Sequence, residues 1–160
     1  MVSTRNIALN IFFDTDYTIL GVDGSLRPHV EQLFQYIIDR NHRIYIWSGN
    51  GIRTKDMEKH SLTDFITNFY EKPVHDYWNN TSKLPEKDRP NMVIDDNLEI
   101  VAILGGIWVN QYYFPNKNDA EMLKVQEIIV EVESSGSSDD PRFRSEERRV
   151  GKECRSRWSP

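Results

Sequence analysis

Short apolar runs alternate with amphipathic stretches along residues 1–133. Residues 7–13 are apolar except at Asn10, which is typical of a strand buried on both faces of a parallel sheet. Shorter apolar segments of the same character predict further strands at 44–47, 65–70, 92–94 and 107–112. The chain is therefore expected to contain five strands.

Helical periodicity separates these strands. Apolar residues at 30, 33, 34, 37 and 38 have the spacing of an amphipathic helix, and Pro28 stands where a first helical turn begins. Short helices are predicted at 53–60 and 98–104, the second ending at Gly105–Gly106. A last helix is expected to be capped by Asn118, with Glu121 three residues on, and to bury Val125, Ile128, Ile129 and Val132.

Strands that alternate with helices favour a parallel sheet with right-handed crossovers. We therefore predict one α/β domain over residues 1–133, a Rossmann-like three-layer sandwich with a five-stranded parallel sheet. Residues 134–143 contain the run Ser-Ser-Gly-Ser-Ser and are expected to form a flexible Ser/Gly/Asp tail.

Residues 144–160 turn abruptly basic and resemble the in-frame translation of a widely used sequencing-library adapter. A basic, disordered arm for nucleic acid or membrane is the alternative interpretation. We exclude this stretch from fold prediction as an artefact and expect it to be disordered. Without its six basic and three acidic side chains, the formal net charge falls from −5 to −8. The only cysteine, Cys154, also lies there, so the domain has no disulfide or thiolate chemistry.

The sequence gives no sign of a membrane or secretory role. No apolar run approaches the roughly 18–20 residues of a membrane span, and the first residues lack the apolar stretch of a secretory signal. We therefore predict a cytoplasmic protein without a membrane partner. The acidic charge argues against nucleic acid as a partner, without excluding it, because non-specific binding there depends on basic surface.

Polar side chains stand directly after each of the first four predicted strands. Parallel strands end at one edge of a sheet, and ligands of such folds bind in the crevice at that edge. Carboxylates, a hydroxyl and an ammonium group are therefore expected to face one crevice. The segments concerned are Asp14-Thr15-Asp16-Tyr17-Thr18, Ser48-Gly49-Asn50, Lys72-Pro73 and Asp95-Asp96.

In this order the segments resemble the four motifs of the haloacid dehalogenase (HAD) superfamily, over about residues 7–112. The family motifs are Asp-x-Asp-x-Thr after an apolar strand, a strand ending in Ser or Thr, a Lys often followed by Pro, and a strand ending in paired acids. In this chain they are met by Asp14, Asp16 and Thr18, by Ser48, by Lys72, and by Asp95 and Asp96.

The resemblance implies a small HAD-like phosphatase that hydrolyses phosphomonoesters with Mg²⁺. Asp14 would be the nucleophile that forms an aspartyl-phosphate, and Asp16 the general acid and then the general base. Mg²⁺ would be held by Asp14, the backbone carbonyl of Asp16, Asp95 and Asp96. The catalytic set would also include Ser48 and Lys72, and phosphate would be bound by Thr18, Ser48, Gly49, Asn50 and Lys72.

Two features bear on the substrate. Tyr17 stands where the family usually has Gly, and the spacing between motifs leaves no room for a sizeable cap domain. By the resemblance, an open site suits a phosphate on a macromolecule, or a small substrate covered by a neighbouring subunit. We expect a phosphorylated small molecule or a phosphoprotein as partner and leave an oligomer open. The irregular stretch 74–90, with Tyr77 and Trp78, is the candidate substrate loop.

Two other functions stay open. The first is a non-catalytic binding or regulatory module with the HAD fold, which Tyr17 and the missing cap would suit. The second is a nucleic-acid-end phosphatase, which would prefer phosphorylated oligonucleotides over phosphopeptides and sugars.

Overall fold

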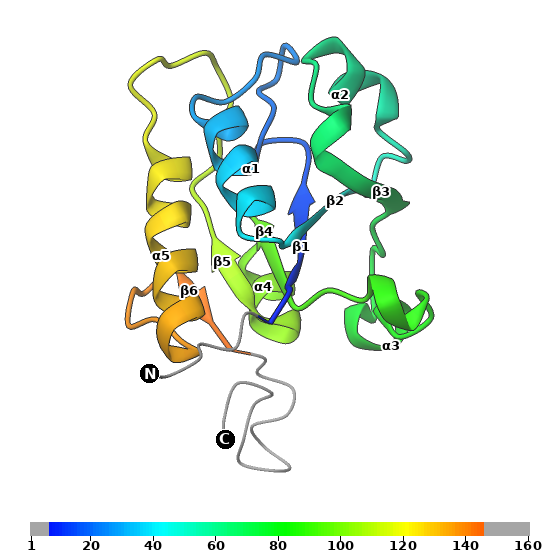
Figure 1. Cartoon of the computed structure of the whole chain (residues 1–160). Coiled ribbons are helices and arrows are strands. Elements are labelled where there is room, and N and C mark those ends of the chain that lie inside the picture. Colours follow the sequence, from blue (N-terminus) through cyan, green and yellow to red (C-terminus); the bar gives the residue numbers. More distant parts are fainter. Residues whose placement is uncertain (1–6, 146–160) are drawn as a thin grey trace.

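A computed structural model describes residues 7–145 of the chain. It has an α/β fold with one six-stranded sheet, in the order β3-β2-β1-β4-β5-β6, and helices on both sides (Figure 1). The parallel strands are β1 (Asn10–Asp14), β2 (Arg43–Ser48), β3 (Ile66–Glu71), β4 (Met92–Asp95) and β5 (Gly106–Trp108). The five predicted strands are therefore confirmed, with shifted ends.

The sheet separates two apolar cores. Neighbouring residues of a strand point to opposite faces, so Phe13 packs with α1 (Val30–Asp39) and α5 (Glu121–Ser135), whereas Phe12 packs with α4 (Leu98–Leu104). Because both faces of β1 are covered, its sequence is almost uniformly apolar. The three-layer arrangement that the sequence predicts is therefore present.

Smaller elements complete the chain. After β2 come α2 (Thr54–Lys59) and the 3-10 turn η1 (Thr63–Phe65), and α3 (Tyr77–Thr81) and the turn η2 (Glu86–Asp88) lie between β3 and β4. Within residues 7–145, no helix combines the length and the apolar character that crossing a bilayer requires.

A sixth strand corrects the prediction of a purely parallel, five-stranded sheet. β6 (Phe143–Arg144) pairs antiparallel with β5, so the sheet is mixed. Two contacts of Arg142 hold β6 beside β5. The Trp108 backbone N–H donates to the Arg142 carbonyl at 2.8 Å, and Arg142 forms an ion pair of 2.9 Å with Glu121. A two-residue strand has no periodicity of its own, and the sequence therefore does not reveal it.

The stretch 134–143, expected to be a flexible tail, is packed at both ends. Ser134 and Ser135 form the last turn of α5, Gly136 ends that helix, and Phe143 is buried with 8% of its surface exposed. Arg144, inside the adapter-like stretch, pairs with Gly106 through the backbone. Residues 146–160, with Cys154, lie outside the described residues.

Two further predictions differ in detail. The last helix begins at Glu121, and Asn118 does not cap it; instead Asp119 accepts a hydrogen bond from the Glu121 backbone N–H at 3.2 Å. Gly105 does end α4, whereas Gly106 starts β5. A Cβ on Gly106 would lie 1.9 Å from the Val93 carbonyl oxygen, so the close approach of β5 to β4 requires glycine there.

Candidate functional site

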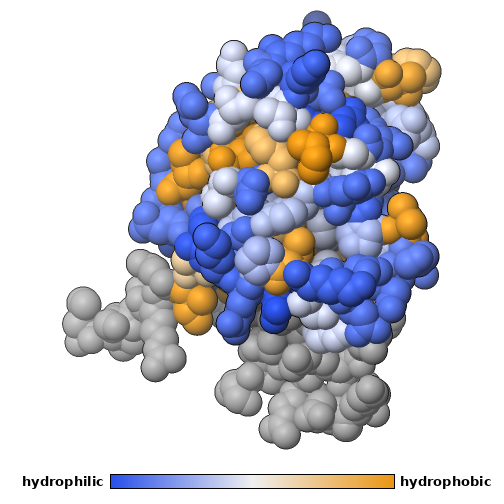
Figure 2. Space-filling model, turned by 90° about the vertical axis from the view of Figure 1, so that its right-hand side faces the viewer, coloured by the Kyte–Doolittle hydropathy of each residue, from blue (hydrophilic) through white to orange (hydrophobic). Residues whose placement is uncertain are grey.

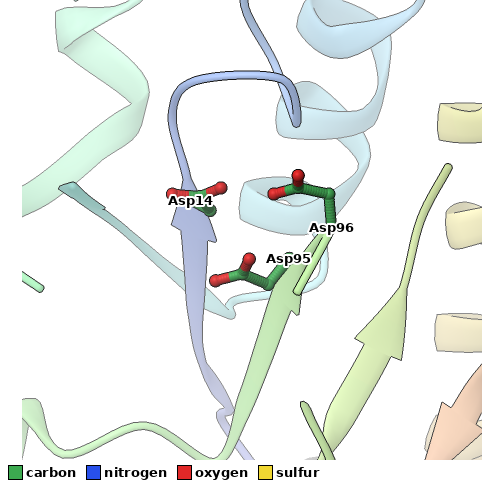
Figure 3. A group of neighbouring side chains, drawn as sticks. All are labelled: Asp14, Asp95 and Asp96. Atoms are coloured by element: carbon green, nitrogen blue, oxygen red, sulfur yellow. The ribbon is translucent and has the colours of Figure 1, made fainter. Parts of the chain in front are cut away.

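Three carboxylates meet where the central strands end. Asp14 is the last residue of β1 and Asp95 the last of β4, and these strands are neighbours in register. Asp96 follows directly, and carboxylate oxygens of all three residues lie within 4.8 Å of one another. Figure 3 shows the carboxyl groups of Asp95 and Asp96 on the side that faces Asp14, at the ends of the two strands. The convergence predicted from the strand ends is therefore present.

Lys72 reaches this cluster from the end of β3. Its ammonium lies 3.0 Å from Asp14 Oδ1 and 3.1 Å from Asp95 Oδ2, and its backbone N–H donates to the Ser48 carbonyl at 2.9 Å. Burial alone lowers the pKa of Lys72, but the charges of Asp95 and Asp14 outweigh burial and raise that pKa above its ordinary value. Lys72 is therefore a fixed positive charge between two carboxylates.

The cluster holds three carboxyl groups and one ammonium group. Burial, and next the charge of Asp95, raise the pKa of Asp14 well above its ordinary value. Burial likewise raises the pKa of Asp95 to about 6, against the opposite effect of Lys72. One ammonium does not balance three carboxylates, and several close carboxylate oxygens are the donors that a hard divalent cation prefers. The donor set therefore fits Mg²⁺ chemically.

Neighbouring side chains hold Asp14 and Asp96 in place. The buried Thr18 hydroxyl lies 3.0 Å from Asp14 Oδ2 and 3.3 Å from Asp96 Oδ1. The Gln111 side-chain amide donates to Asp96 Oδ2 at 3.0 Å, and the Trp108 indole N–H donates to the Asp96 carbonyl at 3.0 Å. Thr18 thus positions carboxylates in this structure, and its contact with phosphate stays a prediction.

Asp16 is turned towards the loop that follows β2. Its Oδ2 accepts hydrogen bonds from Arg53 Nη1 at 2.7 Å and from Asn50 Nδ2 at 2.8 Å. Burial raises the pKa of Asp16, but the bonds from Arg53 and Asn50 outweigh burial, and the pKa lies below its ordinary value. Asp16 is therefore held as an ionised side chain beside the carboxylate cluster.

The loop after β2 is organised around the Ser48 hydroxyl. Ser48 Oγ accepts from the Asn50 backbone N–H at 3.0 Å and from Arg53 Nη1 at 3.1 Å. The Asn50 amide, predicted as a phosphate donor, is thus engaged within the loop, and Gly49 is exposed directly after the strand. The Arg53 guanidinium therefore contacts both the Ser48 hydroxyl and the Asp16 carboxylate.

Arg53 is the residue that the sequence reasoning missed most clearly. The sequence predicts Arg53 as the start of the polar helix 53–60, whereas it precedes α2 and also bonds Asp56 through Nε at 2.7 Å. Gln111 and Trp108 were also missed, as members of the predicted fifth strand. Trp108 and Gln111 stand at or just after the end of β5, which is a signal that the sequence offers, whereas Arg53 lies too far beyond β2 for this signal.

Tyr17 adopts the backbone conformation that glycine usually supplies. Its φ is 68°, in the left-handed region, and its ring packs against Tyr113 with centroids 5.1 Å apart. The Tyr17 carbonyl accepts from the Tyr112 backbone N–H at 2.9 Å. The turn after β1 therefore has a left-handed residue that is not glycine, and Tyr17 adds a partly exposed ring to this turn.

Arg27 fixes the turn that follows Tyr17. Its fully buried guanidinium makes two bonds with Asp119, at 2.8 and 3.0 Å, and donates to the carbonyls of Thr18 and Asn110. It also lies over the Tyr112 ring. Arg27 thereby connects the turn after β1 to the loop after β5, and Gln111 of that loop bonds Asp96.

The candidate substrate loop contains a cavity of about 510 Å³ between α3 and α4. Its lining combines apolar, aromatic and acidic side chains. The surface on the side of β3 and α3 is mainly hydrophilic, with separate apolar patches (Figure 2). The residues that line the cavity are Val74, His75, Asp76, Tyr77, Trp78, Glu99 and Ile103.

Comparisons with protein-family models, with curated proteins and with solved structures find no match for this chain.

Proposed function

We propose that this chain is a magnesium-dependent phosphomonoesterase with a HAD-like fold. One observation carries the proposal: Asp14, Asp95 and Asp96 bring carboxylate oxygens within 4.8 Å of one another at the strand ends, and Lys72 lies among them. A nucleophilic carboxylate, a cation site and a fixed positive charge are the parts that phosphoryl transfer through an aspartyl-phosphate needs.

In the proposed reaction, an oxygen of Asp14 attacks phosphorus and the bond from phosphorus to the leaving oxygen breaks. Asp16 gives a proton to the leaving oxygen, then takes a proton from water, and this water attacks the aspartyl-phosphate to release inorganic phosphate and regenerate Asp14. Lys72 balances negative charge on Asp14 and on the phosphoryl oxygens. The Ser48 hydroxyl donates a hydrogen bond to a phosphoryl oxygen.

The cation would be held by Asp14, Asp95 and Asp96, with the backbone carbonyl of Asp16. When bound, Mg²⁺ lowers the repulsion between the carboxylates and a dianionic phosphate and stabilises charge in the transition state. The surplus of carboxylates over Lys72 supports a divalent cation in this role.

Asp16 has to leave its resting partners before it can act as an acid. Arg53 and Asn50 hold it in the ionised form, which accepts a proton but cannot donate one. An incoming phosphate would compete with Asp16 for Arg53, because the guanidinium lies 3.1 Å from Ser48 Oγ. Substrate binding would thereby release the Asp16 carboxylate, which would take up a proton from solvent and then give this proton to the leaving oxygen.

The ion pair of Asp16 also favours a second candidate, a module that binds Mg²⁺ and phosphate without hydrolysis. If Arg53 held Asp16 permanently, the acid step would not occur. The two candidates differ in turnover, not in metal binding.

Hydrolysis of a generic aryl phosphate tests the proposal. We expect turnover that requires Mg²⁺, stops with chelator, and falls at least about 10³-fold in Asp14→Asn and Asp95→Asn, while circular dichroism shows an unchanged fold. The matched control is Glu127→Gln, an exposed acid on α5, which should keep full activity. A folded wild-type protein that binds Mg²⁺ without turnover would instead support the non-catalytic module.

A further inference from the structure

The cavity between α3 and α4 combines apolar walls with an acidic rim. Ile103 and the partly buried Tyr77 and Trp78 supply the apolar and aromatic surface, and Asp76 and Glu99 supply exposed carboxylates. A volume of about 510 Å³ lies within the range of roughly 300–1,000 Å³ that small-ligand sites occupy.

This chemistry suits a cation on an aliphatic stem. Asp76 accepts two hydrogen bonds from Asn79, whereas within residues 7–145 no cationic side chain pairs with Asp76 or Glu99. Lysine and arginine bury their methylene stems on apolar surface while the charged end stays at the rim, and both interact favourably with aromatic rings. An anion would meet two carboxylates and no lysine or arginine in the lining.

Two segments that line the cavity are close along the chain to residues of the carboxylate site. Val74, in its lining, is two residues from Lys72, and two residues span at most about 7 Å. Val74 also lies beside Gly49 in the loop after β2, because a Cβ built on Gly49 would be 3.8 Å from Val74 Cγ1. The Glu99 backbone N–H donates to Asn97 Oδ1, and the Asn97 backbone N–H donates to Asp95 Oδ1. A ligand that reaches both places needs only a few residues of extended chain.

Exposed apolar side chains also follow the ends of the strands. Among residues 7–145, most of the exposed large apolar residues belong to the segments that follow the parallel strands, one or more per strand. An extended polypeptide spans about 3.3–3.6 Å per residue, so a few of its residues can contact more than one of these segments. The residues are Tyr17, Val22, Ile52, Val74, Tyr113 and Phe114 in loops, and Leu98 at the start of α4.

We infer that the cavity between α3 and α4 binds a lysine or arginine side chain, two to four residues from the phosphorylated residue of a polypeptide substrate. The inference rests on the proposed phosphatase function and names its substrate class. The acidic rim and the net charge of −8 over residues 1–143 favour such a basic polypeptide over an anionic membrane or a nucleic acid.

Two short phosphoserine peptides test this inference. They are identical except that positions two to four on both sides of the phosphoserine are arginine in one and glutamine in the other. We expect the wild-type kcat/KM to be at least about fivefold higher for the arginine peptide. Asp76→Asn with Glu99→Gln should bring this ratio close to one. Asp39→Asn with Glu127→Gln, which removes two exposed acids elsewhere, should leave the ratio unchanged.

A binding measurement separates this inference from the proposed function. Fluorescence anisotropy with Asp14→Asn protein, which cannot turn the peptides over, should show the same preference for the arginine peptide and its loss with the Asp76 and Glu99 substitutions. Aryl-phosphate hydrolysis without a peptide preference in either measurement would overturn the cavity assignment alone. A binding preference without any hydrolysis would overturn the proposed function and keep the assignment. A preference for phosphorylated oligonucleotides or for an aminoalkyl phosphate over the arginine peptide would contradict the assignment of the cavity to a basic side chain of a polypeptide.

Discussion

The Arg53 guanidinium lies 2.7 Å from the Asp16 carboxylate and connects the loop after β2 to the loop after β1. Arg53 has 16% of its side chain exposed and also bonds Ser48 Oγ and Asp56. It therefore connects two residues to which the proposed reaction gives a role.

We expect Arg53→Gln to lower kcat/KM for an aryl phosphate at least about tenfold, because the incoming phosphate loses the guanidinium that it takes from Asp16 in the proposed reaction. Arg53→Lys should recover part of this loss, since an ammonium keeps the charge without the fork geometry. Steady-state kinetics check both variants, with Lys55→Gln, an exposed neighbour, as control. Unchanged kinetics in Arg53→Gln would show that Arg53 has no role in the reaction.

Arg27 is expected to contribute strongly to stability. Arg27→Met leaves the Asp119 carboxylate and the carbonyls of Thr18 and Asn110 without their buried donor, which should cost about 3–5 kcal/mol of unfolding free energy. Urea unfolding measures this cost. In the double variant with Asp119→Asn, the loss should be smaller than the sum of the two single losses. Strict additivity would show that the pair is not coupled.

Phe143 tests whether β6 belongs to the folded domain. Phe143→Ala should lower the unfolding free energy by about 2–4 kcal/mol, because the ring is buried in the core beside α5. The control is Phe114→Ala, whose side chain is 72% exposed and whose loss should change stability by less than about 0.5 kcal/mol. Equal effects of the two substitutions would mean that the end of the chain does not pack in solution.

Glu133 predicts a pH dependence of stability away from the site. Its carboxylate accepts from Tyr36 Oη at 2.7 Å, from His42 Nε2 at 2.5 Å and from Arg40 Nε at 3.3 Å. Because His42 Nδ1 accepts from the Leu9 backbone N–H, Nε2 is the nitrogen that carries the proton. Burial raises the pKa of Glu133, but these hydrogen bonds outweigh burial and lower it.

A lowered pKa means that the folded protein binds fewer protons than the unfolded chain at this residue. The stabilisation by Glu133 is therefore complete above the unfolded pKa of about 4.3 and is lost as the pH falls through the folded pKa. Glu133→Gln should cost about 1–3 kcal/mol at pH 7, and the difference from wild type should shrink below about pH 4. Urea unfolding at both pH values checks this, with Glu127→Gln on the same helix as control. If the difference in unfolding free energy between wild type and Glu133→Gln did not change with pH, the predicted lowering of the Glu133 pKa would be wrong.

The parts of the site that the sequence predicts share one property. Asp14, Asp95 and Lys72 each come at or just after the end of an apolar strand, and parallel strands bring such positions together whatever the connecting loops do. The alternation of strands and helices likewise predicts the layers. Arg53 escapes this reasoning because it lies five residues after Ser48, where loop conformation decides what a long side chain reaches.

The sixth strand could not be predicted for a related reason. Residues 134–142 have the polar composition of a linker, and Phe143 is a single apolar residue at the edge of the adapter-like stretch. Only its tertiary contact with the core distinguishes it from an exposed phenylalanine such as Phe114. Local composition carries no information on that contact.

The chemical role of Asp14 is tested most directly by trapping the phosphorylated protein. The wild-type protein is mixed with an aryl phosphate and Mg²⁺, the reaction is quenched with acid within the first turnover, and the intact protein and its peptides are measured by mass spectrometry. The proposed mechanism predicts one phosphoryl group on the peptide that contains Asp14, removed by hydroxylamine as expected for an acyl phosphate and absent from Asp14→Asn. A phosphoryl group on Ser48 or another residue, or full hydrolysis by Asp14→Asn, would contradict it.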